Sequence, residues 1–100
     1  MINTAFESEG TTLTVKPDGQ LDSMTSPPFE EEVRRHLSGV RNVIVDFEKV
    51  DYVSSAGLRV FLALDSTLKD QDAEIKLIHV NENIMEIFEM VGFPEVITVE

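Results

Sequence analysis

The sequence predicts an α/β fold in which helices pack on a mixed, mainly parallel β-sheet that begins with an antiparallel N-terminal strand. Two short segments with partial alternation of apolar and polar residues come first, and helix-type and strand-type segments then alternate to the end of the chain. Strands that are separated by helices return through right-handed crossovers and therefore lie parallel. A length of 100 residues is enough for one core, so we expect a single domain over residues 1–100.

The N-terminal strands are expected to form a hairpin. The segments "TAFESEG" and "TTLTVKP" meet at Glu9 and Gly10, which are typical of a turn between antiparallel strands. Pro17 and Gly19 are expected to interrupt the second strand, and "QLD" resumes it briefly.

The segment "TSPPFEEEVRRHLSG" predicts the first helix. Thr25 or Ser26 is the expected cap, the prolines suit the first turn, and Gly39 is the expected stop. Apolar residues four apart form one stripe, which predicts an amphipathic helix with one buried face and one solvent-exposed face. These residues are Phe29, Val33 and Leu37.

The segment "NVIVDF" is apolar without alternation, which is typical of a central strand covered by helices on both faces. After "EKVDYV", a second helix is expected from Ser55 to about Leu68. Apolar residues cover nearly every side of its first turns, so we expect this half to be buried. These residues are Leu58, Val60, Phe61, Leu62 and Leu64.

The C-terminal part is expected to contain a strand in "AEIKLIHV", a helix in "NENIMEIFEMVG" and a last strand over residues 96–99. Asn81 or Asn83 is the expected cap of this helix, and Gly92 is its expected stop. Its expected buried stripe consists of Ile84, Ile87, Phe88 and Val91.

Composition and charge exclude several classes of protein. Apolar residues make up 42% of the chain and the net charge is -11, which indicates a folded domain that repels nucleic acid and anionic membranes. The absence of cysteine excludes disulfides and thiolate chemistry. The longest apolar run, residues 60–64, is too short to span a membrane, and the N-terminus lacks a signal-peptide pattern. We therefore expect a soluble, cytoplasmic domain; nothing in the sequence demands pairing between chains.

Two adjacent serines, Ser54 and Ser55, stand where the second helix begins. A serine before an apolar helix usually caps it, which is worth about 1 kcal/mol. The same helix N-terminus also suits a phosphate, which would add roughly -1.5 to -2 charges beside Asp46 and Asp51. Gly57 can equally serve close packing alone. The residue types leave both interpretations, cap and phosphorylation site, open.

Three segments together resemble a STAS domain of the anti-sigma factor antagonist (anti-anti-sigma factor) type. These segments are "GQLDSMTSPPFEEEV", "VIVDFEKVDYVSSAGLRVFLAL" and "ENIMEIFEMVGFPEVITV". Gly19-Gln20-Leu21-Asp22 is similar to the family's Gly-Glu-Leu-Asp segment. The stretch from Ser54 to Arg59 is similar to its Asp-Ser-Ser/Thr-Gly-Leu-Gly segment, with Ser54, Ala56 and Arg59 replacing the aspartate, the second hydroxyl residue and the later glycine.

The resemblance implies a STAS-like fold and a function in partner switching. The phosphorylated serine of the family falls on Ser55, with Ser54 as the second choice, and the implied partner contacts are Asp22, Thr25, Ser54, Ser55, Ala56, Gly57, Leu58 and Arg59. The unphosphorylated protein would bind an anti-sigma factor that is also a serine kinase and so release a sigma factor. A PP2C-type phosphatase would restore the complex after phosphorylation.

Other chemistries are not expected. Asp22, Asp46 and Asp51 match no compact calcium loop, and His36 and His79 do not suggest a zinc site, so no metal is predicted. Ser55 lacks the preceding glycine of a hydrolase elbow, so we expect neither catalysis nor a cofactor. The alternative is a STAS scaffold, or a binder of a nucleotide or lipid, that does not switch and in which Ser55 only caps a helix.

Overall fold

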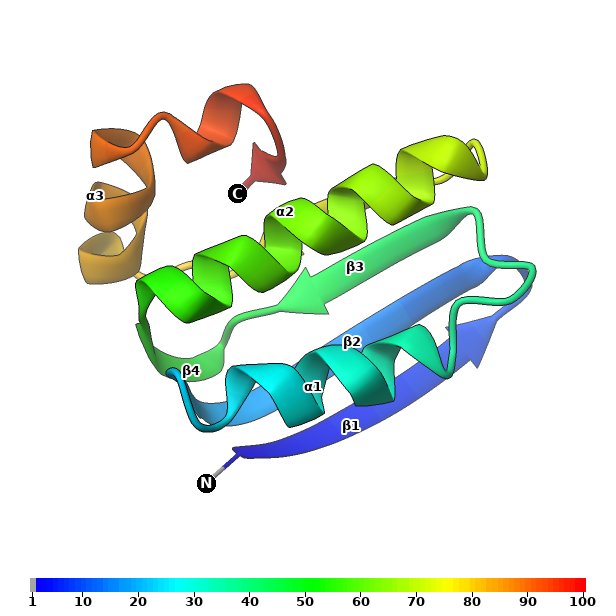
Figure 1. Cartoon of the computed structure of the whole chain (residues 1–100), viewed down its shortest axis with the longest axis horizontal. Coiled ribbons are helices and arrows are strands. Elements are labelled where there is room, and N and C mark those ends of the chain that lie inside the picture. Colours follow the sequence, from blue (N-terminus) through cyan, green and yellow to red (C-terminus); the bar gives the residue numbers. More distant parts are fainter. Residues whose placement is uncertain (1) are drawn as a thin grey trace.

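The computed structural model describes residues 2–100 and shows a mixed sheet with helices (Figure 1). The mainly parallel α/β fold predicted from the sequence is confirmed. Along the chain the elements are β1 (Ile2–Glu9), β2 (Thr12–Leu21), α1 (Ser26–Arg34), β3 (Asn42–Asp46), β4 (Lys49–Val53), α2 (Ser55–Asp70), β5 (Glu74–Ile78), α3 (Glu82–Met90), the short 3-10 helix η1 (Phe93–Glu95) and β6 (Thr98–Val99).

The sheet has the strand order β1-β2-β3-β5-β6, and β4 pairs with β2 beyond the end of β3. The β1–β2 hairpin is antiparallel, as predicted, and all other pairings are parallel. β2 is long enough to serve two neighbours, because its first half pairs with β3 and its second half with β4. The carboxyl ends of β2 and β4 therefore lie side by side.

Only one face of the sheet is packed by helices. Figure 1 shows α1 and α2 in one layer over the strands, with α3 standing near β4. Val43, Val45 and Leu77 point into the core, whereas Ile44 and Lys76 on the other face stay partly accessible. The prediction that the central strand is covered on both faces was wrong, since every second residue of β3 and β5 faces away from the helices.

Phenylalanine rings connect the elements across the core. Phe61 of α2 contacts Phe29 of α1 and Phe47 of the β3–β4 connection, with ring centroids 5.8 and 5.4 Å apart. Phe47 also meets Phe88 of α3 at 6.1 Å, and Phe88 stacks on Phe93 at 4.6 Å. Each ring buries a large apolar surface, so this chain of contacts holds all three helices to one core.

Two strand predictions need correction. β2 continues through Pro17 and Gly19 without a break, because Gly19 adopts a positive φ of 130° and the register with β4 shifts just after it. β4 was not expected at all. Its buried residues Val50 and Val53 are three apart, so the segment lacks the alternation that identifies a strand in sequence.

The three α-helices were predicted in the right order but not with every boundary or face, and the short η1 was not predicted. α1 ends at Arg34, before Gly39, and Leu62 of α2 is exposed although Val60, Phe61 and Leu64 are buried. In α3, Asn81 is the cap and only part of the predicted stripe is buried. Ile84 and Phe88 pack, whereas Ile87 and Val91 are exposed, and the last strand covers only Thr98–Val99. No helix within residues 2–100 is both long and apolar enough to cross a bilayer.

Gly57 in the first turn of α2 lies directly against the ends of β2 and β4. A Cβ at this position would be 2.9 Å from Val53 Cγ1, 3.0 Å from the Leu21 carbonyl oxygen and 3.1 Å from Leu21 Cβ. The backbone oxygen cannot move away like a flexible side chain. The helix start is therefore held against the sheet at a distance that only glycine allows.

At the neighbouring strand ends, Asp46 of β3 and His79 after β5 form an ion pair with Nδ1 and Oδ1 2.8 Å apart. The hydrogen bond to Asp46 and its negative charge raise the pKa of His79. Burial opposes ionisation of Asp46, but hydrogen bonds from the Glu48 N–H and from His79 outweigh it and lower the pKa of Asp46. His79 has a positive φ of 57°, a conformation that asparagine also tolerates.

We predict that Gly57→Ala lowers the free energy of unfolding by about 1 kcal/mol, because an overpacking cost of ~1–3 kcal/mol exceeds the ~1 kcal/mol gain in helix propensity. Denaturant unfolding measures the change. Ser66→Ala on the exposed side of the same helix is the matched control and should be neutral or slightly stabilising. A Gly57→Ala protein as stable as the wild type would contradict the close approach.

We predict that His79→Asn flattens the pH dependence of stability above the unfolded histidine pKa of roughly 6.5. Because the pKa of His79 is raised on folding, its stabilising contribution is complete below the unfolded pKa of roughly 6.5 and disappears as the pH rises through the folded value. Denaturant unfolding at several pH values should show the wild type losing stability relative to the variant as the pH rises. Parallel curves for the two proteins would refute this prediction.

Candidate functional site

The two segments predicted to form the site come together at the carboxyl ends of β2 and β4. Leu21 and Val53 are partners in the parallel ladder, so Asp22 and Ser54, the next residues, leave the sheet side by side. The Ser54 N–H donates a hydrogen bond of 2.8 Å to the Leu21 carbonyl oxygen and fixes the two chain segments to each other. Loops at this edge of a parallel sheet commonly carry binding residues.

The first segment is a tight turn organised by Asp22. Its Oδ1 accepts hydrogen bonds from the N–H groups of Met24 and Thr25, both 2.9 Å long, and these bonds lower the pKa of Asp22. The Thr25 hydroxyl donates to the Gln20 carbonyl oxygen at 2.6 Å and accepts from the Asp22 N–H at 2.9 Å. Asp22 and Thr25 therefore shape the turn that precedes α1.

Thr25 occupies the N-cap position of α1, but its side chain makes no capping hydrogen bond, since it bonds to the turn instead. It is also buried, whereas Ser23 and Met24 of the same turn are exposed, and Met24, at 82%, is the large apolar side chain that the turn presents to solvent. Sequence analysis missed Met24. A methionine beside a cap region gives no signal that distinguishes an exposed position from a buried one.

The adjacent serines have different roles at the start of α2. Ser54 is the N-cap: its backbone is extended, with ψ 178°, and its Oγ accepts a 3.2 Å hydrogen bond from the Ala56 N–H. Ser55 is the first residue of the helix and is exposed. Because Ser54 already caps the helix, the Ser55 hydroxyl has no capping role.

The rest of the predicted site lines the first turn and a half of α2. Gly57 is buried against the sheet, and Ala56 and Leu58 are half-buried. Arg59 is exposed, and its Nη2 donates a long 3.4 Å hydrogen bond to Ser55 Oγ. Leu62, four residues after Leu58 on the same face, is 40% exposed and extends the apolar surface in a way that the sequence did not reveal.

The remaining candidate residues do not join this site. Asp46 pairs with His79, while His36 stacks on Phe6 with ring centroids 3.9 Å apart. Asp51 lies exposed on β4. Among residues 2–100, no group of three or more acidic or histidine side chains is arranged to hold a metal ion.

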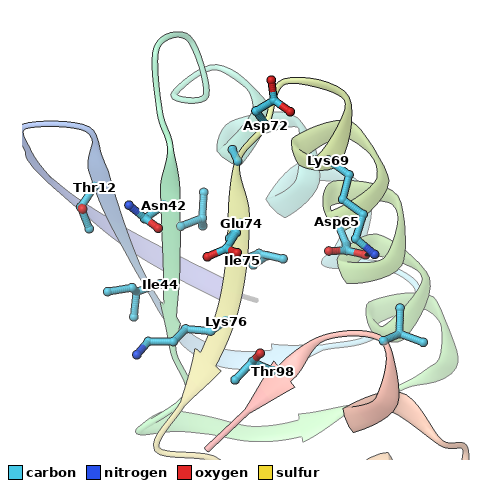
Figure 2. Close-up of a pocket in the computed structure, with 13 residues that line it drawn as sticks. Thr12, Asn42, Ile44, Asp65, Lys69, Asp72, Glu74, Ile75, Lys76 and Thr98 are labelled. Carbon is cyan, nitrogen blue, oxygen red and sulfur yellow. Dashed lines mark ion pairs between the residues drawn. The ribbon is translucent and has the colours of Figure 1, made fainter.

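A hollow of about 720 Å³ lies away from the serines, around the amino ends of β2, β3 and β5 (Figure 2). Thr12, Asn42 and Glu74, the first residues of these strands, line it together with the Asp65–Lys69 ion pair of α2. A second hollow of about 350 Å³ lies between β1, β2 and the Asp46–Lys49 connection. None of the residues predicted for the site lines either of these two hollows.

Comparison with known proteins gives one consistent result. The sequence pattern of the STAS domain matches residues 3–100. BtrV of Bordetella bronchiseptica, whose name classes it as an anti-sigma factor antagonist, is 34% identical over 76 residues, which are 75% of this chain and 66% of BtrV. The anti-sigma-B factor antagonist of Staphylococcus aureus is 33% identical over 86 residues, covering 85% of this chain and 80% of the relative.

The fold agrees with the sequence match. The crystal structure of an anti-sigma factor antagonist from Mycobacterium paratuberculosis superimposes with a TM-score of 0.88 at 17% identity, covering 99% of this chain and 85% of that one. The sheet with its helices on one face, the paired loops after β2 and β4, and the near-complete sequence match lead to one conclusion: the chain belongs to the STAS domain family, and its curated relatives carry the names of anti-sigma factor antagonists.

Proposed function

We propose that this protein is an anti-sigma factor antagonist that works as a phosphorylation-controlled binding module in the cytoplasm. In its unphosphorylated form it binds an anti-sigma factor that is also a serine kinase, and a sigma factor is released. The kinase transfers the γ-phosphoryl group of ATP to Ser55 Oγ, ADP leaves, and the hydroxyl proton passes to the kinase. A PP2C-type phosphatase hydrolyses the ester and restores binding.

The observation that carries this proposal is the division of roles between the two serines. A capping hydroxyl is tied to the backbone, and Ser54 fills that role through the Ala56 N–H. Ser55 is exposed, and its hydroxyl accepts a long hydrogen bond from the exposed side chain of Arg59. A kinase can reach this hydroxyl without unfolding the helix.

The surroundings of Ser55 suit a protein partner. Leu58 and Leu62 present apolar surface on α2, and the exposed Met24 lies in the turn fixed beside the helix start. Apolar side chains of this kind form the cores of protein interfaces, and methionine adapts to different partner shapes. The hollows elsewhere on the protein contain none of these residues.

A phosphate at Ser55 would disrupt such an interface for a physical reason. Burying a dianion without matched donors is costly, and like charges across an interface suppress binding. A loss of about 2.7 kcal/mol would weaken binding about a hundredfold. At the helix N-terminus, however, the phosphate meets free backbone N–H groups, so the fold of the protein itself tolerates it.

The serines should differ sharply in their effects on stability. We predict that Ser54→Ala lowers the free energy of unfolding by about 1 kcal/mol, because the N-cap is lost, whereas Ser55→Ala changes it by less than about 0.5 kcal/mol. Ser54→Asp should remain close to wild type, since aspartate also caps helices. Denaturant unfolding of the three variants tests this, and a larger loss for Ser55→Ala than for Ser54→Ala would show that Ser55 is the cap.

Phosphorylation should occur at Ser55 and abolish partner binding. The test uses the anti-sigma factor kinase of the same organism with ATP, followed by fragment-mapping mass spectrometry and calorimetric binding measurements. We predict one phosphate on the wild type and on Ser54→Ala but none on Ser55→Ala. Ser55→Asp should bind the kinase at least about a hundredfold more weakly than wild type, with an unchanged melting temperature.

The alternative, a scaffold that does not switch, predicts different results in the same experiment. Ser55→Asp would then bind as the wild type does, because aspartate is tolerated at a helix start. Unmodified protein recovered from its own cells under every growth condition, in preparations that preserve phosphoserines elsewhere, would also reject the proposed switch. Ser54→Asp is the matched control, since it adds the same charge one residue away while it keeps the cap.

A further inference from the structure

Arg59 is placed one helical turn after Ser55, on the same face of α2. Its Nη2 lies 3.4 Å from Ser55 Oγ, which is too long for a strong hydrogen bond to a neutral hydroxyl. A phosphate on Oγ would place anionic oxygens within reach of the guanidinium, where they can accept shorter, charge-assisted hydrogen bonds. The geometry is therefore better suited to the modified serine than to the free one.

No competing acid occupies Arg59 on its own helix. The residues three and four positions away are Ser55, Ala56, Leu62 and Ala63, and none of them is charged. Within residues 2–100 Arg59 makes no ion pair, whereas Arg34, Arg35 and Lys69 each pair with an acid four residues earlier on their helices. Arg59 is also the sole basic residue between Lys49 and Lys69.

We propose that Arg59 is the chain's own receptor for the phosphate on Ser55: in the phosphorylated protein its guanidinium donates charge-assisted hydrogen bonds to the phosphate oxygens across one turn of α2. This inference rests on the proposed function in taking Ser55 as the modified residue. The order of the charges is the favourable one, because the anion lies at the helix N-terminus and the cation four residues later. Arginine can hold two phosphate oxygens at once, which lysine cannot do with the same geometry.

The consequence is that the two states of Ser55 present different surfaces. In the unphosphorylated protein Arg59 is exposed and contacts Ser55 Oγ only through a long hydrogen bond, so its charge can meet a carboxylate of a partner. In the phosphorylated protein the phosphate pairs with its charge, so the surface gains a dianion and its nearest cation is no longer available to a partner. In a family member with glycine at this position, phosphorylation would add the phosphate charge to the surface but would not neutralise a neighbouring cation.

The test installs phosphoserine at position 55 by genetic encoding, so that no kinase is required. Phosphorus NMR then follows the second ionisation of the phosphate with pH in the full-length protein at low salt. We expect the pKa of the phosphate to be about half a pH unit lower in the wild type than in Arg59→Gln, because the guanidinium favours the dianion. Arg59→Lys should lie between the two, and the difference should shrink as salt screens the exposed pair.

Arg41→Gln is the matched control, since it removes the same charge from an exposed position just before β3, at the opposite end of the strands. Its phosphate should titrate as in the wild type. As a second measurement, the guanidinium N–H signals of Arg59 should sharpen in the phosphorylated wild type and stay broad in the unmodified protein, which reports the contact without any substitution.

Equal phosphate titrations in the wild type and in Arg59→Gln, together with unchanged guanidinium signals, would overturn the receptor role. That result would leave the cellular phosphorylation of Ser55 untouched, because mass mapping tests it separately. The two tests can also disagree in the other direction. If the phosphate pKa is lower in the wild type than in Arg59→Gln but the cells never phosphorylate Ser55, the proposed switch is rejected and the contact with Arg59 is supported.

Discussion

The approach of α2 to the sheet at Gly57 is the constraint on which the site depends. Leu21 and Val53 end two parallel strands side by side, and the missing side chain of Gly57 lets the helix start rest directly on both. The hydrogen bond from Ser54 to the Leu21 carbonyl oxygen then fixes the helix relative to the Asp22 turn. A helix displaced outward by a side chain would separate the two segments and move the serines away from Met24.

Ser54 keeps the N-cap of α2 at a position where the family motif that this segment resembles has aspartate. Where the family carries aspartate, serine keeps the capping oxygen that the helix needs, since both residue types cap well. What changes is the charge beside Ser55, which is neutral here. Arg59, the one cation of this stretch, contacts the Ser55 hydroxyl, so both departures from the pattern lie beside the same hydroxyl.

The sequence predicted the order of helices and strands well, because alternation, apolar stripes and turn residues are local signals. It also placed the two site segments, since residues that follow parallel strands meet at one edge of a sheet. It missed β4, whose buried Val50 and Val53 do not alternate, and the open face of the sheet, where Ile44 reads as a core residue. Met24 and Leu62 are exposed because no other element packs against them. Local sequence does not contain this information, since it depends on how the helices and strands pack together.

A switch of this kind works best when the modified residue makes no packing contacts with the core. Phe61, on the buried side of α2, joins rings from α1 and the β3–β4 connection, while Ser55 and Arg59 lie on its exposed side. Addition of a phosphate therefore alters charge on one side of the helix without disturbing the packing on the other. Because a helix N-terminus stabilises an anion, a phosphate at Ser55 would be compatible with this fold, and its free-energy cost would fall on the complex with the partner. The proposed switch therefore requires no change of fold, only a change of charge that a partner can read.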